Sequence, residues 1–169
     1  YYSRYSFYSF YNHYTHYSHY SFYNFYSHYL LSNFMLQNHL KPNCIEVGVD
    51  EAGRGCLAGD VYAAAVILPE GFSNDLLNDS KQLTERQRNE LREIIEREAV
   101  AWAVQEISAA RIDEINILNA SFEGMSLAVT QLNPQPEFLA IDGNRFYTKL
   151  EIPFQCVIKG DGKYANIAA

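Results

Sequence analysis

Short apolar segments recur along residues 45–169 and predict a chain built from both strands and helices. Residues 45–50 alternate Ile and Val with Glu and Gly, a pattern that is typical of a strand. Residues 61–68 are almost continuously apolar up to Pro69, which predicts a buried strand. Similar short runs predict three further strands at residues 100–107, 138–143 and 154–161.

Three helices are predicted from capping residues and from apolar positions at helical spacing. Thr84 and Gln87 form a capping-box pair that would start the first helix. The second helix is predicted over residues 113–132, where apolar side chains recur three and four positions apart. Residues 164–169 predict the first turn of a third helix.

The order of these elements indicates an α/β fold with a mixed five-stranded sheet flanked by helices. The short link between the first two strands favours an antiparallel pair. The later strands return through helices, which favours parallel pairing. A length of 169 residues is enough for one domain with a buried core.

Residues 1–34 form a low-complexity repeat of Tyr, Ser, Phe and His. Tyrosine recurs at every third position from Tyr2 to Tyr29, and this period matches neither a helix nor a strand face. The residues between the tyrosines are related by single-base changes. We therefore interpret the segment as a nucleotide repeat read as protein, disordered or non-native, and we predict the folded domain at residues 35–169. The alternative is an aromatic tail that stacks on nucleic acid.

The chain is acidic, with 13 Lys and Arg against 20 Asp and Glu and a net charge of -7. Attraction to a phosphate backbone would therefore have to come from local patches or from bound metal ions. The sequence has no apolar run of about 18 residues and no basic-then-apolar leader. We expect a cytoplasmic monomer that makes no membrane contact.

Acidic residues follow three of the predicted strands. Asp50 and Glu51 end the first strand, and Asp142 and Asp161 stand at the ends of the last two. Open α/β sheets bind ligands at the carboxyl ends of their strands, and carboxylates gathered there would repel one another without a cation. A set of oxygen ligands favours Mg²⁺ or Mn²⁺, and two such ions can hold a phosphodiester between them. Taken singly, an Asp-Gly pair after a strand is often only a turn.

Five motifs occur in order along the chain: Asp-Glu-Ala-Gly-Arg-Gly at 50–55, Asp-Ser-Lys-Gln-Leu at 79–83, Ile-Asn-Ile-Leu-Asn-Ala-Ser at 115–121, Ile-Asp-Gly at 141–143 and Lys-Gly-Asp at 159–161. In this combination residues 45–169 resemble bacterial ribonuclease HII. The resemblance implies a ribonuclease H-like fold and metal-dependent hydrolysis of the RNA strand of RNA·DNA hybrids. It also implies incision on the 5′ side of ribonucleotides embedded in duplex DNA.

The resemblance also implies roles for particular residues. The metal ligands, which are also the catalytic residues, would be Asp50, Glu51, Asp142 and Asp161. The contacts to the nucleic-acid backbone and to the 2′-hydroxyl at the RNA–DNA junction would be Gly53, Arg54 and Gly55. Lys81 would meet a phosphate as a point charge, or would be a solvated loop lysine.

Ribonucleases HII continue beyond the position that matches Ala169, so residues 35–169 are expected to be a catalytic domain that is incomplete at its carboxyl end. Two alternatives to the hydrolase follow. One is a catalytically inactive fragment that binds nucleic acid but lacks the closing helices. The other is a different two-metal phosphoryl-transfer enzyme on a similar sheet, such as a DNA strand transferase.

Overall fold

A mixed sheet of five strands lies at the centre of the part of the chain that the computed structural model describes, residues 36–169. The predicted repeat at 1–34 lies outside the described residues. The strands are β1 (Glu46–Ala52), β2 (Val61–Ile67), β3 (Ala101–Ile107), β4 (Phe138–Asp142) and β5 (Phe154–Val157). They lie side by side in the order β3-β2-β1-β4-β5, so the predicted five-stranded α/β fold is confirmed.

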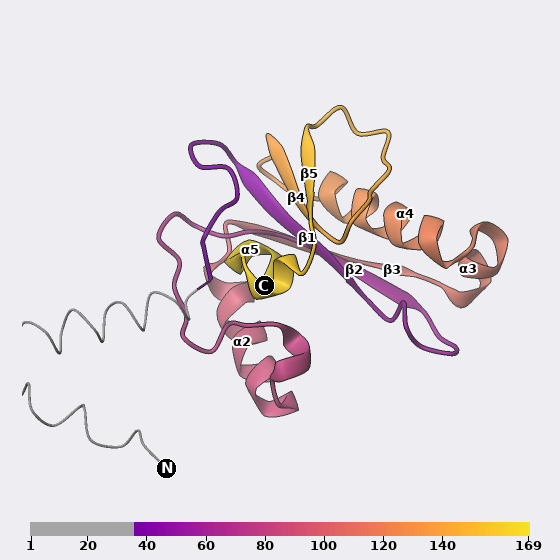
Figure 1. Cartoon of the computed structure of the whole chain (residues 1–169), viewed down its shortest axis with the longest axis horizontal. Helices are drawn as coiled ribbons and strands as arrows, with labels where there is room; N and C mark the ends of the chain where they lie inside the picture. Colours follow the sequence, from indigo (N-terminus) through magenta and orange to yellow (C-terminus); the bar gives the residue numbers. More distant parts are fainter. Residues whose placement is uncertain (1–35) are drawn as a thin grey trace, which may run out of the picture. The chain divides into compact units, whose positions relative to one another are not determined.

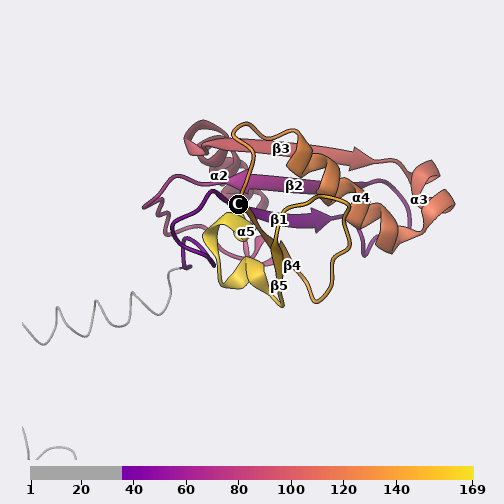
Figure 2. The same cartoon turned by 90° about the horizontal axis from the view of Figure 1, so that it is seen from above.

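Helices cover both faces of this sheet, as Figures 1 and 2 show. They are α2 (Glu85–Glu98), α3 (Ala109–Ile115), α4 (Ile117–Thr130) and α5 (Ala165–Ala168), with short 3-10 turns η1 (Ser80–Gln82) and η2 (Gly160–Gly162). Helix α4 packs on one face, where Met125 and Val129 join Val47 and Val49 of β1 in the larger core cluster. Helices α2 and α5 share a second cluster, which includes Val66 of β2. The sheet is thus buried on both sides at its centre.

The predicted strand directions are confirmed for the first pair and wrong for the second. Strands β1 and β2 are antiparallel, as expected, and the later pairs β1–β4 and β4–β5 are parallel. Strands β2 and β3 are joined through α2, yet they are antiparallel. The reason is that Ile67, the last residue of β2, pairs with Ala101, the first residue of β3. The segment containing α2 therefore leaves and returns at the same end of the sheet and does not cross it.

The helix predicted at 113–132 is wrong as a single element, because Asn116 divides it into α3 and α4. Asn116 has a φ of 67°, in the left-handed region that a helix interior does not allow. Its side-chain oxygen accepts hydrogen bonds from the backbone N–H groups of Leu118 and Asn119, both at 3.1 Å. The residue is the N-cap of α4 and the C-cap of α3 at once. Apolar spacing continues through this break, so periodicity alone does not reveal it.

The first predicted helix and the predicted start of the last one are confirmed. Thr84 caps α2 and forms the expected reciprocal capping box with Gln87. Helix α5 begins at Ala165, close to the predicted position. Within residues 36–169, no helix is long and apolar enough to cross a membrane.

Candidate functional site

Asp50 and Asp142 lie near the carboxyl ends of two neighbouring parallel strands, β1 and β4. The register of β1 with β4 pairs Val49 with Ile141, and the next residue on each strand is one of the two aspartates. Neighbouring strands are about 4.8 Å apart, and residues at matching positions in a parallel pair share one face. The register between two segments that are distant in the sequence thus places two carboxylates side by side.

Glu51 lies next to Asp50 but projects to the opposite side of β1, because successive strand residues alternate. Both acids belong to β1, which continues to Ala52, so the predicted end of this strand at residue 50 is wrong by two positions. The Glu51 carboxylate accepts a hydrogen bond from Arg54 Nη1 at 3.1 Å, and its own N–H donates to Asp50 Oδ1 at 2.7 Å. The two neighbouring acids are therefore held in different surroundings.

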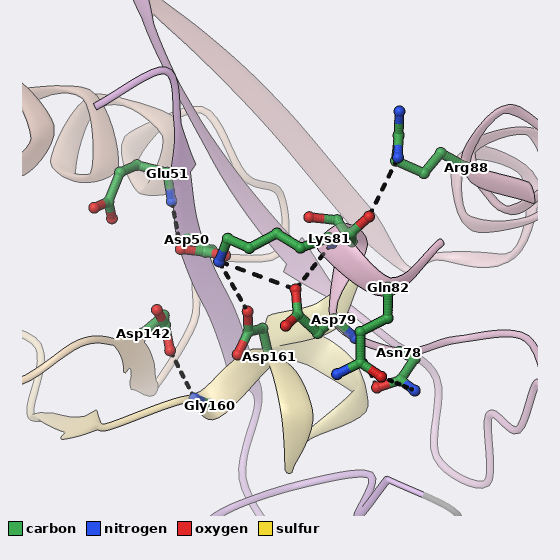
Figure 3. Close-up of polar contacts among 11 residues, drawn as sticks. Asp50, Glu51, Asn78, Asp79, Lys81, Gln82, Arg88, Asp142, Gly160 and Asp161 are labelled. Carbon is green, nitrogen blue, oxygen red and sulfur yellow. Dashed lines mark hydrogen bonds and ion pairs between the residues drawn. The ribbon is translucent and has the colours of Figure 1, made fainter. Parts of the chain in front are cut away.

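Asp161 also lies at this end of the sheet, but it belongs to a turn and not to the end of a strand. Strand β5 ends at Val157, and Asp161 belongs to η2, so the predicted strand at 154–161 is too long. The backbone N–H of Gly160 donates to Asp142 Oδ1 at 2.6 Å. This bond fastens the turn carrying Asp161 to the end of β4, as Figure 3 shows.

Burial and mutual repulsion raise the pKa values of three of these acids. The pKa of Asp50 rises to about 7, first because of burial and then because of the neighbouring Asp142 carboxylate. Burial also raises the pKa of Glu51, although Arg54 opposes the shift. The pKa of Asp161 is raised by burial, then by Asp142 and Asp79, against the opposing charge of Lys81. These shifts mark a site where negative charges are close enough to affect one another.

Two residues of the 79–83 motif complete the cluster. Lys81 Nζ lies 3.7 Å from Asp161 Oδ2 and 4.0 Å from Asp79 Oδ1. Asp79 also caps η1 by accepting the Lys81 backbone N–H at 2.9 Å. The sequence prediction left Asp79 out of the site, and its place beside Lys81 in the motif is the signal that could have found it.

The predicted loop at Gly53, Arg54 and Gly55 directly follows β1 and lies beside Glu51. Gly53 has a φ of 95°, and a Cβ atom there would lie 2.6 Å from the Asp60 carbonyl oxygen. Gly55 has open space around the position of a Cβ. The first glycine is thus required by the fold, whereas the second leaves the surface of the loop accessible.

The donor set suits a hard divalent cation, since every candidate ligand is a carboxylate oxygen. As they stand, no three His, Cys, Asp or Glu side chains between Leu36 and Ala169 are arranged to hold a metal ion. In this arrangement three of the carboxylates make other contacts: Asp142 accepts from Gly160, Glu51 from Arg54, and Asp161 faces Lys81. Metal binding would require some of these side chains to turn toward one another.

Comparisons with known proteins show which family the chain and its fold resemble. The Ribonuclease HII family model matches residues 47–169. Ribonuclease HII of Bacteroides thetaiotaomicron is 64% identical over 135 residues, which cover 80% of this chain and 68% of that protein. The crystal structure of ribonuclease H2 from Pyrococcus horikoshii OT3 is similar with a TM-score of 0.63 and 25% identity, covering 73% of this chain and 66% of that one.

A third comparison extends the fold similarity to a more distant protein. Bst-RNase HIII, crystallised in complex with Mn²⁺, matches with a TM-score of 0.54 and 16% identity. The match covers 82% of this chain and 51% of that protein. At this identity the similarity concerns the fold alone.

Proposed function

The chain belongs to the ribonuclease HII family, the type II ribonucleases H that cut RNA/DNA hybrids, and we propose that Asp50, Glu51, Asp142 and Asp161 are its metal-binding catalytic residues. The proposal rests on one observation: acids from β1, β4 and η2 lie together at the carboxyl ends of the parallel strands. Such a concentration of negative charge is unfavourable unless protons or cations neutralise it.

The four carboxylates would hold Mg²⁺ or Mn²⁺, which prefer oxygen ligands. When bound, such ions supply the positive charge that stabilises the transition state of phosphodiester hydrolysis. The raised pKa of Asp50, about 7, means that this side chain holds a proton over part of the neutral range. That proton must leave when a cation binds, because a carboxylate ligand has to be ionised.

The hydrogen bond from Gly160 to Asp142 supports the roles of both acids. It fixes the orientation of one Asp142 oxygen and leaves the other free to bind a ligand. It also sets the distance between β4 and the turn that carries Asp161. A ligand shell supported by such hydrogen bonds binds its cation with less reorganisation.

We further propose that Gly53, Arg54 and Gly55 contact the substrate at the RNA–DNA junction. The loop follows Glu51 directly, so a nucleic-acid backbone bound there would lie beside the carboxylates. A 2′-hydroxyl both donates and accepts hydrogen bonds, and it distinguishes RNA from DNA at a single position. We also propose that the protein incises duplex DNA on the 5′ side of an embedded ribonucleotide. It would act as a monomer in the cytoplasm.

A cleavage assay with matched substrates tests the proposal. The chain is incubated with Mg²⁺ or Mn²⁺ and a duplex that carries one ribonucleotide, beside an all-DNA duplex and an RNA/DNA hybrid. We expect cleavage of the hybrid and of the ribonucleotide-containing duplex on the 5′ side of the ribonucleotide. Asp142→Asn should lose this activity, whereas Glu93→Gln, which removes an exposed acid on α2, should keep it.

The other outcomes identify the alternatives. Binding of the duplex without cleavage in either metal would favour a catalytically inactive nucleic-acid-binding chain. Equal cleavage of the all-DNA duplex would favour a different two-metal phosphoryl-transfer enzyme. Full activity of Asp142→Asn would refute the assignment of the carboxylates.

A further inference from the structure

Lys81 reaches the carboxylate cluster from a segment that carries none of the four candidate ligands. It belongs to η1, between β2 and α2. Figure 3 shows its side chain extending from η1 toward Asp161 and Asp79. The distances from Nζ to the nearest oxygens of Asp161 and Asp79, 3.7 and 4.0 Å, are those of ion pairs and not of direct hydrogen bonds.

The charge of Lys81 acts on the whole cluster. Its pKa is raised first by Asp79 and then by Asp161, with further contributions from Asp50 and Asp142. Arg54, a second cation near the site, is paired with Glu51 on the opposite side of β1. Among the residues that the structure describes, Lys81 is therefore the cation in ion-pair contact with Asp161.

We propose that the Lys81 ammonium is the counter-ion of the metal-free carboxylate cluster and that a divalent cation must displace it from Asp161. The inference rests on the proposed metal site. A cation bound by Asp161 and its neighbours would be repelled by an ammonium only 3.7 Å from the Asp161 oxygen. The two positive charges therefore compete for the same carboxylates.

The geometry allows this exchange because the backbone of Lys81 is held in place while its side chain is exposed to solvent. The backbone N–H is held by the Asp79 carboxylate at 2.9 Å, within the η1 turn. The side chain itself is 81% exposed, so Nζ can turn from Asp161 into solvent while the η1 backbone stays in place. In the displaced position the same ammonium would be available to a substrate phosphate.

Metal affinity provides the direct test. The dissociation constant of Mn²⁺ is measured at low ionic strength, in the absence of nucleic acid, for the unchanged chain and for Lys81→Met. Removal of the competing charge should tighten Mn²⁺ binding about two- to fivefold, the range expected for an exposed ion pair. Arg97→Gln is the matched control, since it removes an exposed cation that pairs with Glu98 at the far end of α2.

A second measurement follows the ammonium in the unchanged chain. The Cε–Nζ nuclear magnetic resonance signal of Lys81 is assigned from its absence in Lys81→Met, and Mg²⁺ is then added. The signal should shift in step with metal occupancy and end near the values of solvated lysines. In Asp142→Asn, which should bind Mg²⁺ poorly, the shift should require a much higher Mg²⁺ concentration.

The outcomes separate this inference from the proposed function. If the unchanged chain binds neither Mn²⁺ nor Mg²⁺, the metal site and the role of Lys81 both fail. If the chain binds Mn²⁺ but Lys81→Met binds it with equal or lower affinity, the metal site stands and the counter-ion role is refuted. An Nζ signal that stays unchanged at full Mg²⁺ occupancy would refute it as well.

Discussion

Asp50 illustrates how much the surroundings of a single side chain decide in this protein. Its carboxyl has an ordinary pKa of 3.8, and burial, followed by repulsion from Asp142, raises this value to about 7. The exposed acids on α2 carry the same type of group, but water surrounds them. A residue type therefore indicates candidate chemistry, whereas the local dielectric and the neighbouring charges determine its protonation.

The raised pKa of Asp50 predicts how pH affects the stability of the metal-free protein. Between pH 3.8 and about 7 the folded state holds a proton at Asp50 that the unfolded state has lost. The free energy of unfolding must therefore fall as the pH rises through this window. At higher pH the whole of this loss of stability persists. In the presence of a chelator, Asp50→Asn should raise the melting temperature more at about pH 8 than at about pH 5.

Calorimetry at the two pH values checks this prediction, with Glu93→Gln as the control for the loss of one surface charge. The control should change the melting temperature little at either pH. A stabilisation by Asp50→Asn that is equal at both pH values would contradict the raised pKa.

The two glycines beside Arg54 should respond differently to substitution by alanine. Gly53→Ala places a Cβ 2.6 Å from the Asp60 carbonyl oxygen at a φ of 95°, so we expect a destabilisation of roughly 1–3 kcal/mol. Gly55→Ala meets open space and should leave the free energy of unfolding nearly unchanged. If the loop contacts the substrate, Gly55→Ala should instead weaken binding of the ribonucleotide-containing duplex.

Urea unfolding and duplex-binding measurements on both variants separate the two effects. Equal loss of stability in the two variants would contradict the structural difference between these positions. Unchanged duplex affinity in Gly55→Ala would argue against a substrate contact at Gly55.

At the scale of single elements, the boundary between α3 and α4 shows how one residue can override a periodic pattern. The apolar spacing that predicts a helix at 113–132 continues across Asn116. Its left-handed backbone and its side-chain cap nevertheless end one helix and begin the next. A φ of 67° with a ψ of 160° is a conformation that favours glycine, and the side-chain bonds of Asn116 to the backbone of α4 help to hold it there.

Two substitutions at Asn116 distinguish the contribution of the cap from that of the backbone. Asn116→Gly removes the bonds to Leu118 and Asn119 but tolerates the φ of 67°, so it should destabilise the fold by less than about 1 kcal/mol. Asn116→Ala loses the same cap and also strains the backbone, for a total of roughly 2–3 kcal/mol. Urea unfolding gives both values, and an alanine variant more stable than the glycine variant would contradict the assigned conformation.

At the scale of the whole molecule, Glu46 joins segments that are far apart in sequence. Its carboxylate is 1% exposed and accepts hydrogen bonds from Asn166 of α5 and from the backbone of Leu40 and Lys41. On the same face of β1, Gly48 lies so close to the Asn166 backbone that no larger residue would fit. Helix α5 follows the turn that carries Asp161, so this contact also supports the position of that acid.

Glu46→Gln should destabilise the protein by about 1–3 kcal/mol, because an amide N–H would replace an acceptor that faces buried donors. Glu137→Gln is the matched control, since its carboxylate also accepts a backbone N–H, from Ile45, but at an exposed site. Hydrogen exchange should show faster exchange of the Ala168 and Ala169 amides in Glu46→Gln alone. Equal effects of the two substitutions would mean that Glu46 does not link α5 to the sheet.

The sequence predicts the elements and the chemistry of the site better than it predicts their arrangement. Local patterns are sufficient for the capping box at Thr84 and for the apolar strands, because these depend on residues close in the chain. The antiparallel pairing of β2 with β3 depends on where a long connection returns to the sheet. No short-range signal contains that information.

The amino-acid sequence by itself determined the strand and helix composition, the family, and the acids that are available for metal chemistry. Each of these is recorded in residue types and in short spacings. The tertiary structure alone decided that Asp142 lies beside Asp50, that Glu51 points away from it, and that Lys81 stands against Asp161. These relations depend on strand register and on turns between distant segments, and the free energy of such contacts exists only in the folded chain.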